Sequence, residues 1–157
     1  MLAKSKSQID LDACRQAVDV CACFHFRKAS RAVTQLFDET LAPSGLRSTQ
    51  LVILVHISIT ETPTVLNLAA DLVMDRSTLA RNLKPLEKQR LIKIVPGKKD
   101  RRTRLISLTA RGRKTLLSAL PLWQEAQTRF VGRLGQRRWT ETVANLKASV
   151  AASQADP

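Results

Sequence analysis

The sequence predicts a mainly α-helical protein that contains one small β-hairpin. Apolar residues recur at helical spacing along most of the chain, as they do in amphipathic helices. Between residues 92 and 108 this period gives way to two short segments that mix apolar and polar residues, which is typical of paired strands. With 44% hydrophobic and 25% charged residues, the chain has the composition of a folded globular protein.

One long helix is expected near the N-terminus. Residues 10–41 contain no glycine or proline and repeat apolar side chains at helical spacing, and Pro43 and Gly45 then end the helix. Ser48 can cap a second helix over residues 49–59. Because that helix is apolar almost all round, we expect it at the centre of the core.

Two short helices follow, and the second is amphipathic. Pro63 breaks the chain, and Thr64 precedes the first of the two. Asp75 can accept hydrogen bonds from the free backbone N–H groups of the next helix, over residues 76–89. Its apolar stripe consists of Leu79, Leu83 and Leu86. The opposite side carries Ser77, Arg81, Lys84 and Lys88, with Thr78 and Asn82 on its flanks.

A basic hairpin and two long helices complete the chain. Residues 92–94 and 104–108 are predicted to be strands joined by an extended basic tip. Thr109 can cap a long helix that ends at Gly135, and a last helix covers about 136–152. The predicted order is therefore four helices, a hairpin and two helices.

The charge of the chain is concentrated in one segment. The sequence has 26 Lys and Arg against 13 Asp and Glu, a net charge of +13. Residues 75–114 hold fourteen of the basic and three of the acidic residues, so they carry a net charge of +11. Such an excess indicates a polyanionic partner, for which nucleic acid, an anionic membrane surface and an acidic protein are the candidates.

The sequence favours a cytoplasmic protein without membrane contact. No apolar run approaches the roughly 18 to 20 residues that a membrane span needs. Residues 1–9 lack the apolar core of a signal peptide. Three closely spaced cysteines do not resemble the framework of a secreted disulfide scaffold, so we expect them to be thiols.

The two short helices have the chemistry of a DNA-binding helix-turn-helix. The second presents hydroxyl, amide and guanidinium groups opposite its leucine stripe, and a helix of this kind fits the major groove. The predicted contacts from this helix are Arg76, Ser77, Thr78, Arg81, Asn82 and Lys84. Of these, Ser77, Thr78, Arg81 and Asn82 have the chemistry for base edges, and Lys84 is expected on a phosphate. The hairpin tip adds Lys98, Lys99, Arg101 and Arg102, which would reach phosphates or the minor groove.

Three segments resemble the MarR family of regulators. They are DRSTL at 75–79, RNL at 81–83 and DRRTRLISLTARG at 100–112. The resemblance implies a winged helix-turn-helix in an obligate homodimer, with the first and last helices of both subunits interleaved. It also implies that Arg102 enters the minor groove, that Asp100 positions an arginine of the wing, and that a pseudo-palindromic operator is bound, usually for repression.

This arrangement predicts a division of the chain. Residues 48–112 would form the DNA-binding domain, residues 10–47 and 113–152 a helical dimerisation region, and residues 1–9 and 153–157 flexible tails. The apolar side chains that we expect to need a partner surface include Trp123, Phe130 and Trp139. The alternative is that these helices pack within their own subunit.

The regulatory signal is left open by the sequence. Cys14, Cys21 and His25 fall close to one face of the predicted first helix, a pattern compatible with a metal, arsenite or redox site. The alternative is that the cysteines pack the dimer core. The resemblance implies instead a small aromatic anion as effector. The candidate effector or redox residues are Cys14, Cys21, Cys23, His25, Arg27 and His56, and no metal ligand set or cofactor is assigned.

Two other classes of function could use parts of this sequence. A thiol enzyme that uses Cys21 with His25 lacks a convincing third group to orient the base, so we expect no enzymatic activity. A nonspecific architectural or RNA-binding protein would also use the basic segment. The absence of aromatic residues from that segment argues against recognition of single strands.

Overall fold

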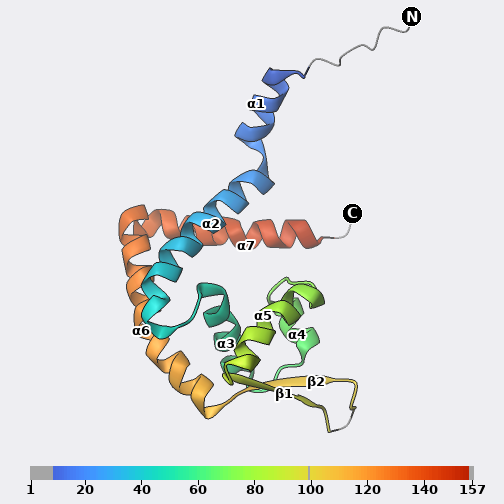
Figure 1. Cartoon of the computed structure of the whole chain (residues 1–157). Helices are drawn as coiled ribbons and strands as arrows, with labels where there is room; N and C mark the ends of the chain where they lie inside the picture. The colour runs from blue at the N-terminus through green and yellow to red at the C-terminus, as the bar shows by residue number, and fades with distance from the viewer. Residues whose placement is uncertain (1–8, 99, 156–157) are drawn as a thin grey trace, which may run out of the picture. The chain divides into compact units, whose positions relative to one another are not determined.

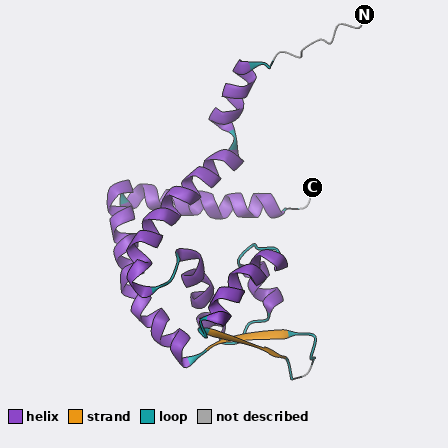
Figure 2. Ribbon diagram, in the orientation of Figure 1, coloured by secondary structure: helices purple, strands orange, loops and turns teal. Residues whose placement is uncertain are grey.

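The structure is a computed structural model that describes residues 9–98 and 100–155. It divides the chain into two compact units, residues 1–35 and 36–157. Most of the described residues are helical, and two antiparallel strands form the hairpin (Figures 1 and 2). The predicted fold class is confirmed.

The predicted single helix over residues 10–41 is wrong, because the structure divides it at Cys21. Helix α1 spans Leu11–Val20 and α2 spans Ala22–Leu41, and Cys21 between them is extended, with φ −67° and ψ 110°. Because the helix stops there, the last carbonyl oxygens of α1 have no backbone N–H donors from a following helical turn. The ring of His25 compensates in part, since its Nε2 donates to the Asp19 carbonyl oxygen at 2.9 Å.

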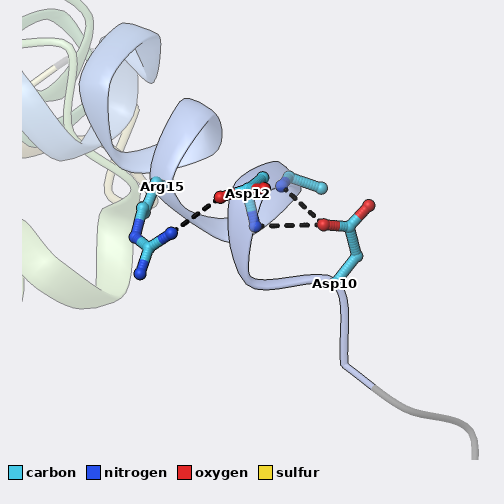
Figure 3. Close-up of polar contacts among 4 residues, drawn as sticks. Asp10, Asp12 and Arg15 are labelled. Carbon is cyan, nitrogen blue, oxygen red and sulfur yellow. Dashed lines mark hydrogen bonds and ion pairs between the residues drawn. The ribbon is translucent and has the colours of Figure 1, made fainter.

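Asp10 caps the start of α1. The Asp10 carboxylate accepts hydrogen bonds from the backbone amides of Asp12 and Ala13, at 3.0 and 3.1 Å (Figure 3). Arg15 then pairs with the Asp12 carboxylate at 2.7 Å. These contacts are exposed, so we expect them to orient the first turn and to contribute little to stability.

The second unit is built around α3, which spans Ser48–Thr60. Helices α4 (Val65–Asp71) and α5 (Arg76–Lys88) contact each other, and α3 contacts both α5 and the hairpin. A short 3-10 helix, Ala42–Ser44, precedes α3. The fully buried side chains include Ile53, Leu54, Ile57, Leu68, Leu79, Leu86 and Ile106. The prediction that the apolar helix lies at the centre of the core is confirmed.

The hairpin is tied to the segment that precedes α4. Strands β1 (Ile92–Pro96) and β2 (Arg104–Leu108) pair antiparallel, from Ile92 opposite Leu108 to Pro96 opposite Arg104. On its other edge, β2 receives a bridge between Thr64 and Leu105, and the Ile106 amide donates to the Pro63 carbonyl at 2.9 Å. The wing and the helix-turn-helix are therefore joined by backbone hydrogen bonds.

Two long helices follow the hairpin. Helix α6 spans Ala110–Leu134, and α7 spans Gln136–Gln154, two residues beyond its predicted end. Phe130 of α6 and Trp139 of α7 meet edge to face, with ring centroids 5.6 Å apart. Each ring therefore covers part of the other, and both remain half-buried in the single chain. Of the predicted tails, residues 1–8 and 156–157 lie outside the described residues.

Candidate nucleic-acid interface

A tight turn connects α4 to α5. The Thr64 hydroxyl caps α4 by accepting a hydrogen bond from the Asn67 amide at 3.0 Å. After α4, Val73 adopts a left-handed conformation with φ 51°, and the Met74 amide donates to the Ala69 carbonyl at 2.8 Å. This conformation closes the end of α4 and turns the chain toward α5. The two helices therefore form the helix-turn-helix that the sequence predicts.

Helix α5 has one buried and one exposed side. Leu79, Leu83 and Leu86 are buried, as their spacing predicts. The predicted DNA contacts Arg76, Ser77, Arg81 and Lys84 are exposed, whereas Thr78 and Asn82 are half-buried. The Asn82 side-chain amide donates to the Thr78 carbonyl at 3.0 Å. One of the two protons of this side-chain amide is thus bonded to its own helix.

Asp75 organises the first turn of α5. One carboxylate oxygen accepts the Ser77 hydroxyl at 2.6 Å and the Thr78 amide at 2.7 Å, and the other accepts the Thr78 hydroxyl at 2.7 Å. The Thr78 oxygen in turn accepts a hydrogen bond from Nη2 of Arg81 at 2.9 Å. Sequence reasoning identified the cap and missed this network, which links three of the predicted DNA contacts.

Because of its hydrogen bonds, Asp75 is expected to stay ionised in mild acid. Donation from the Ser77 side chain, and then from the Thr78 side chain and amide, holds the pKa of Asp75 well below its usual range. A carboxyl group whose pKa is lowered by folding stabilises the folded state at any pH above its ordinary pKa of about 3.9. This contribution is lost as the pH falls through the pKa of the group in the folded state. NMR titration of the Asp75 carboxyl carbon should therefore give a midpoint below about 3.9 that rises in a Thr78→Val variant. A midpoint that Thr78→Val leaves unchanged would contradict the assignment.

The hairpin tip is closed by Asp100. Its carboxylate accepts the Arg102 amide at 2.9 Å and the Thr103 hydroxyl at 3.2 Å, and the Gly97 amide donates to the Thr103 carbonyl at 2.9 Å. Asp100 therefore holds the backbone of the tip, which fits the supporting role that the resemblance implies for it. Lys98, Arg101 and Arg102 are exposed, and Lys99 lies outside the described residues.

A surface hollow joins the two parts of the interface. It is lined by Thr64 and Asn67 of the α4 start, Arg76 of α5, and Asp100, Arg102 and Arg104 of the hairpin, among others. Arg76 and Arg102 are predicted contacts from different elements, and the hollow brings them to one place. Arg104 was not among the predicted contacts, although its position at the outer end of an alternating strand could have indicated it.

The candidate effector residues are spread over α1, α2, α3 and the break between the first two helices. The break at Cys21 removes the shared helical face expected for Cys14, Cys21 and His25. All three cysteines are exposed thiols, and Nδ1 of His56 bonds the Val52 carbonyl of its own helix at 2.9 Å. Arg27 is exposed. Within residues 9–98 and 100–155, no group of three or more His, Cys, Asp and Glu side chains is arranged to hold a metal ion.

Comparison with known proteins identifies the family. The model of a winged helix DNA-binding domain matches residues 46–112. The transcriptional regulator MosR of M. tuberculosis, solved in complex with DNA, is 37% identical; the match covers 86% of this chain and 99% of MosR, with a TM-score of 0.75. The chain belongs to the MarR family of transcriptional regulators. It is therefore a DNA-binding transcriptional regulator.

Two further structures share the fold of this MarR-family chain. A mutant MarR of E. coli, complexed with operator DNA, is 20% identical over 88% of this chain and 97% of its own, with a TM-score of 0.73. BpsR of Bordetella bronchiseptica, whose DNA binding is regulated by 6-hydroxynicotinic acid, is 21% identical over 87% and 96%, with a TM-score of 0.75. No curated protein matches the chain. Among the described helices, none has both the length and the apolar character that a membrane span requires.

Proposed function

We propose that this chain is a homodimeric cytoplasmic repressor that binds a pseudo-palindromic operator and is released by a small-molecule, metal or metalloid, or thiol-oxidising signal. The observation that carries the proposal is the exposed face of α5, with Ser77 and Arg81, beside a basic wing tip. Such a helix suits the major groove, and the arginines of the tip suit phosphates or the minor groove. MosR and MarR were solved on DNA, which supports the same use here.

A homodimer is supported by apolar side chains that remain exposed on the first and last helices. The residues concerned are Leu11, Val18, Phe24 and Phe26 of α1 and α2, and Leu117, Leu120, Trp123, Leu146 and Val150 of α6 and α7. Large apolar side chains that are exposed along whole helices favour an interaction surface. We propose that residues 10–47 and 113–152 dimerise while residues 48–112 bind DNA. A two-fold dimer would place two copies of α5 on half-sites about one DNA turn apart.

The test is a binding assay at fixed salt. The purified protein is titrated onto the duplex upstream of its own gene, with unrelated duplex as competitor, and its mass on DNA is measured by sedimentation. A sequence-specific repressor should prefer its operator by a factor of about 10³ or more and bind as a dimer. Equal affinity for both duplexes would show a nonspecific basic protein instead.

The same assay identifies the signal. A thiol oxidant, then arsenite and then salicylate are added in separate experiments. The compound that releases the protein from the operator identifies the class of signal. Alanine at Cys14, Cys21 or Cys23 should abolish release by the first two and leave release by salicylate intact. If no addition releases the protein, these three signal classes are excluded.

Arg81 is expected to read a base. Its alanine variant should lose roughly 1 to 3 kcal/mol of operator affinity and accept other base pairs at one position, since an arginine commonly pairs with the guanine edge. Lys88→Ala, at the exposed end of α5, is the control, because a phosphate contact weakens binding to all sequences alike. Uniform weakening in both variants would make Arg81 a phosphate contact as well.

A further inference from the structure

The inference concerns the two hydroxyl groups in the first turn of α5 and rests on the proposed DNA-binding face. We propose that Asp75 is a specificity-determining residue that fixes the hydroxyls of Ser77 and Thr78 as hydrogen-bond acceptors toward DNA. The first turn of α5 then selects a base that presents an amino group in the major groove, adenine or cytosine. A hydroxyl that is free to rotate could also donate its proton to the acceptor oxygen of guanine or thymine.

Ser77 and Thr78 each bond Asp75 through the hydroxyl group. A serine or threonine hydroxyl has one proton to donate and two lone pairs to accept with. An ionised carboxylate can only accept, so both hydroxyls must donate to Asp75. Their distances of 2.6 and 2.7 Å are those of short charge-assisted bonds. Neither hydroxyl has a second proton to give to a base.

The remaining lone pairs decide what each hydroxyl can meet. In the major groove, adenine presents its N6 amino group and cytosine its N4 amino group, whereas guanine and thymine present acceptor oxygens there. Oxygens that can only accept pair with the amino groups and repel the carbonyl oxygens. One lone pair of the Thr78 hydroxyl oxygen already accepts a hydrogen bond from Arg81, which leaves the other lone pair for a base. The Thr78 hydroxyl thus both selects a base and orients the neighbouring guanidinium.

The charge of Asp75 is not required for capping alone. Asparagine caps a helix about as well as aspartate, and it would not bring a negative charge close to phosphates. Asp75 is exposed within a segment of net charge +11, so its carboxylate opposes binding to every DNA sequence. A residue that weakens general affinity while it orients two hydroxyls favours discrimination between sequences.

The experiment compares the base preferences of four variants with those of the natural protein, each selected from a library of random duplexes. Thr78→Val removes the hydroxyl, Thr78→Ser retains it, and Asp75→Asn retains the cap while its amide N–H₂ faces the Thr78 oxygen. That amide donates, so the Thr78 hydroxyl must turn its proton outward. Asp71→Asn removes one exposed negative charge at the last residue of α4 and outside this network, and it serves as the charge control. Circular dichroism melting confirms that each variant is folded.

The expected result is specific to one base position per half-site. Thr78→Val should flatten a preference for adenine or cytosine by about fivefold, Thr78→Ser should keep it, and Asp75→Asn should shift it toward guanine or thymine. Asp71→Asn should leave the base preferences unchanged. The inference is overturned if the position that Thr78→Val flattens prefers guanine or thymine in the natural protein, or if Asp75→Asn retains the natural base there. Failure of the natural protein to select any motif would overturn the proposed function itself.

Discussion

Replacing Gly112 with alanine is expected to lower the free energy of unfolding by about 3 kcal/mol or more. A Cβ atom built at Gly112 would lie 1.9 Å from the carbonyl oxygen of Leu91 and 2.9 Å from its carbonyl carbon. Both atoms belong to the backbone, so no side chain can rotate away. The same carbonyl accepts the Thr109 amide at 3.0 Å, and the Thr109 hydroxyl caps α6 through the Gly112 amide at 2.9 Å. The added methyl group would separate α6 from the start of the wing.

The control for this substitution is Gly132→Ala in the same helix. Gly132 lies inside α6, and a Cβ atom there meets nothing within 4 Å. Alanine has the higher helix propensity, so this variant should be more stable by about 0.5 to 1 kcal/mol. Urea unfolding measured by circular dichroism compares the two. A Gly112→Ala variant as stable as the natural protein would show that α6 does not approach Leu91 this closely.

Replacing Leu79 with alanine is expected to lower the free energy of unfolding by about 2 to 5 kcal/mol. Leu79 is 0% exposed and belongs to the stripe through which α5 packs on the core. Alanine would remove most of a buried side chain and leave a cavity. Leu79 packs the helix that carries Arg81 against the core. Near the melting temperature of the variant, we therefore also expect weaker binding to every DNA sequence.

The control is the same substitution on the neighbouring helix. Leu66 of α4 is 54% exposed, so Leu66→Ala should change the free energy of unfolding by less than about 1 kcal/mol. Thermal and urea unfolding of both variants, at protein concentrations well above the expected dimer dissociation constant, provide the comparison. Similar losses in the two variants would contradict the assignment of Leu79 to the buried side.

The DNA-binding half of the molecule could be predicted from local sequence patterns. The spacing of Leu79, Leu83 and Leu86 sets the buried side of α5 and therefore also sets which polar residues face outward. The change from helical to alternating period locates the wing. These inferences succeed because the periodicity of a helix or a strand is a local property, and because one apolar side must be buried in either case.

Other features could not be predicted because they depend on contacts between residues whose proximity the apolar periodicity does not indicate. The break at Cys21 lies in a segment with uninterrupted helical spacing, and the His25 ring bonds a carbonyl six residues earlier. The pairing of Phe130 with Trp139 requires α7 to fold back on α6. Apolar periodicity records which side of a helix avoids water, and it does not record which neighbour covers that side.

The sequence by itself determined the fold class, the basic segment and the outward face of α5, since these follow from periodicity and charge. The tertiary structure alone decided how those groups are connected. It placed Arg76 and Arg102 around one hollow, because β2 is hydrogen-bonded to the chain before α4. The bonds from the Ser77 and Thr78 hydroxyls to Asp75 are local instead, because the backbone of a helix start brings a capping carboxylate within reach of the side chains two and three residues later.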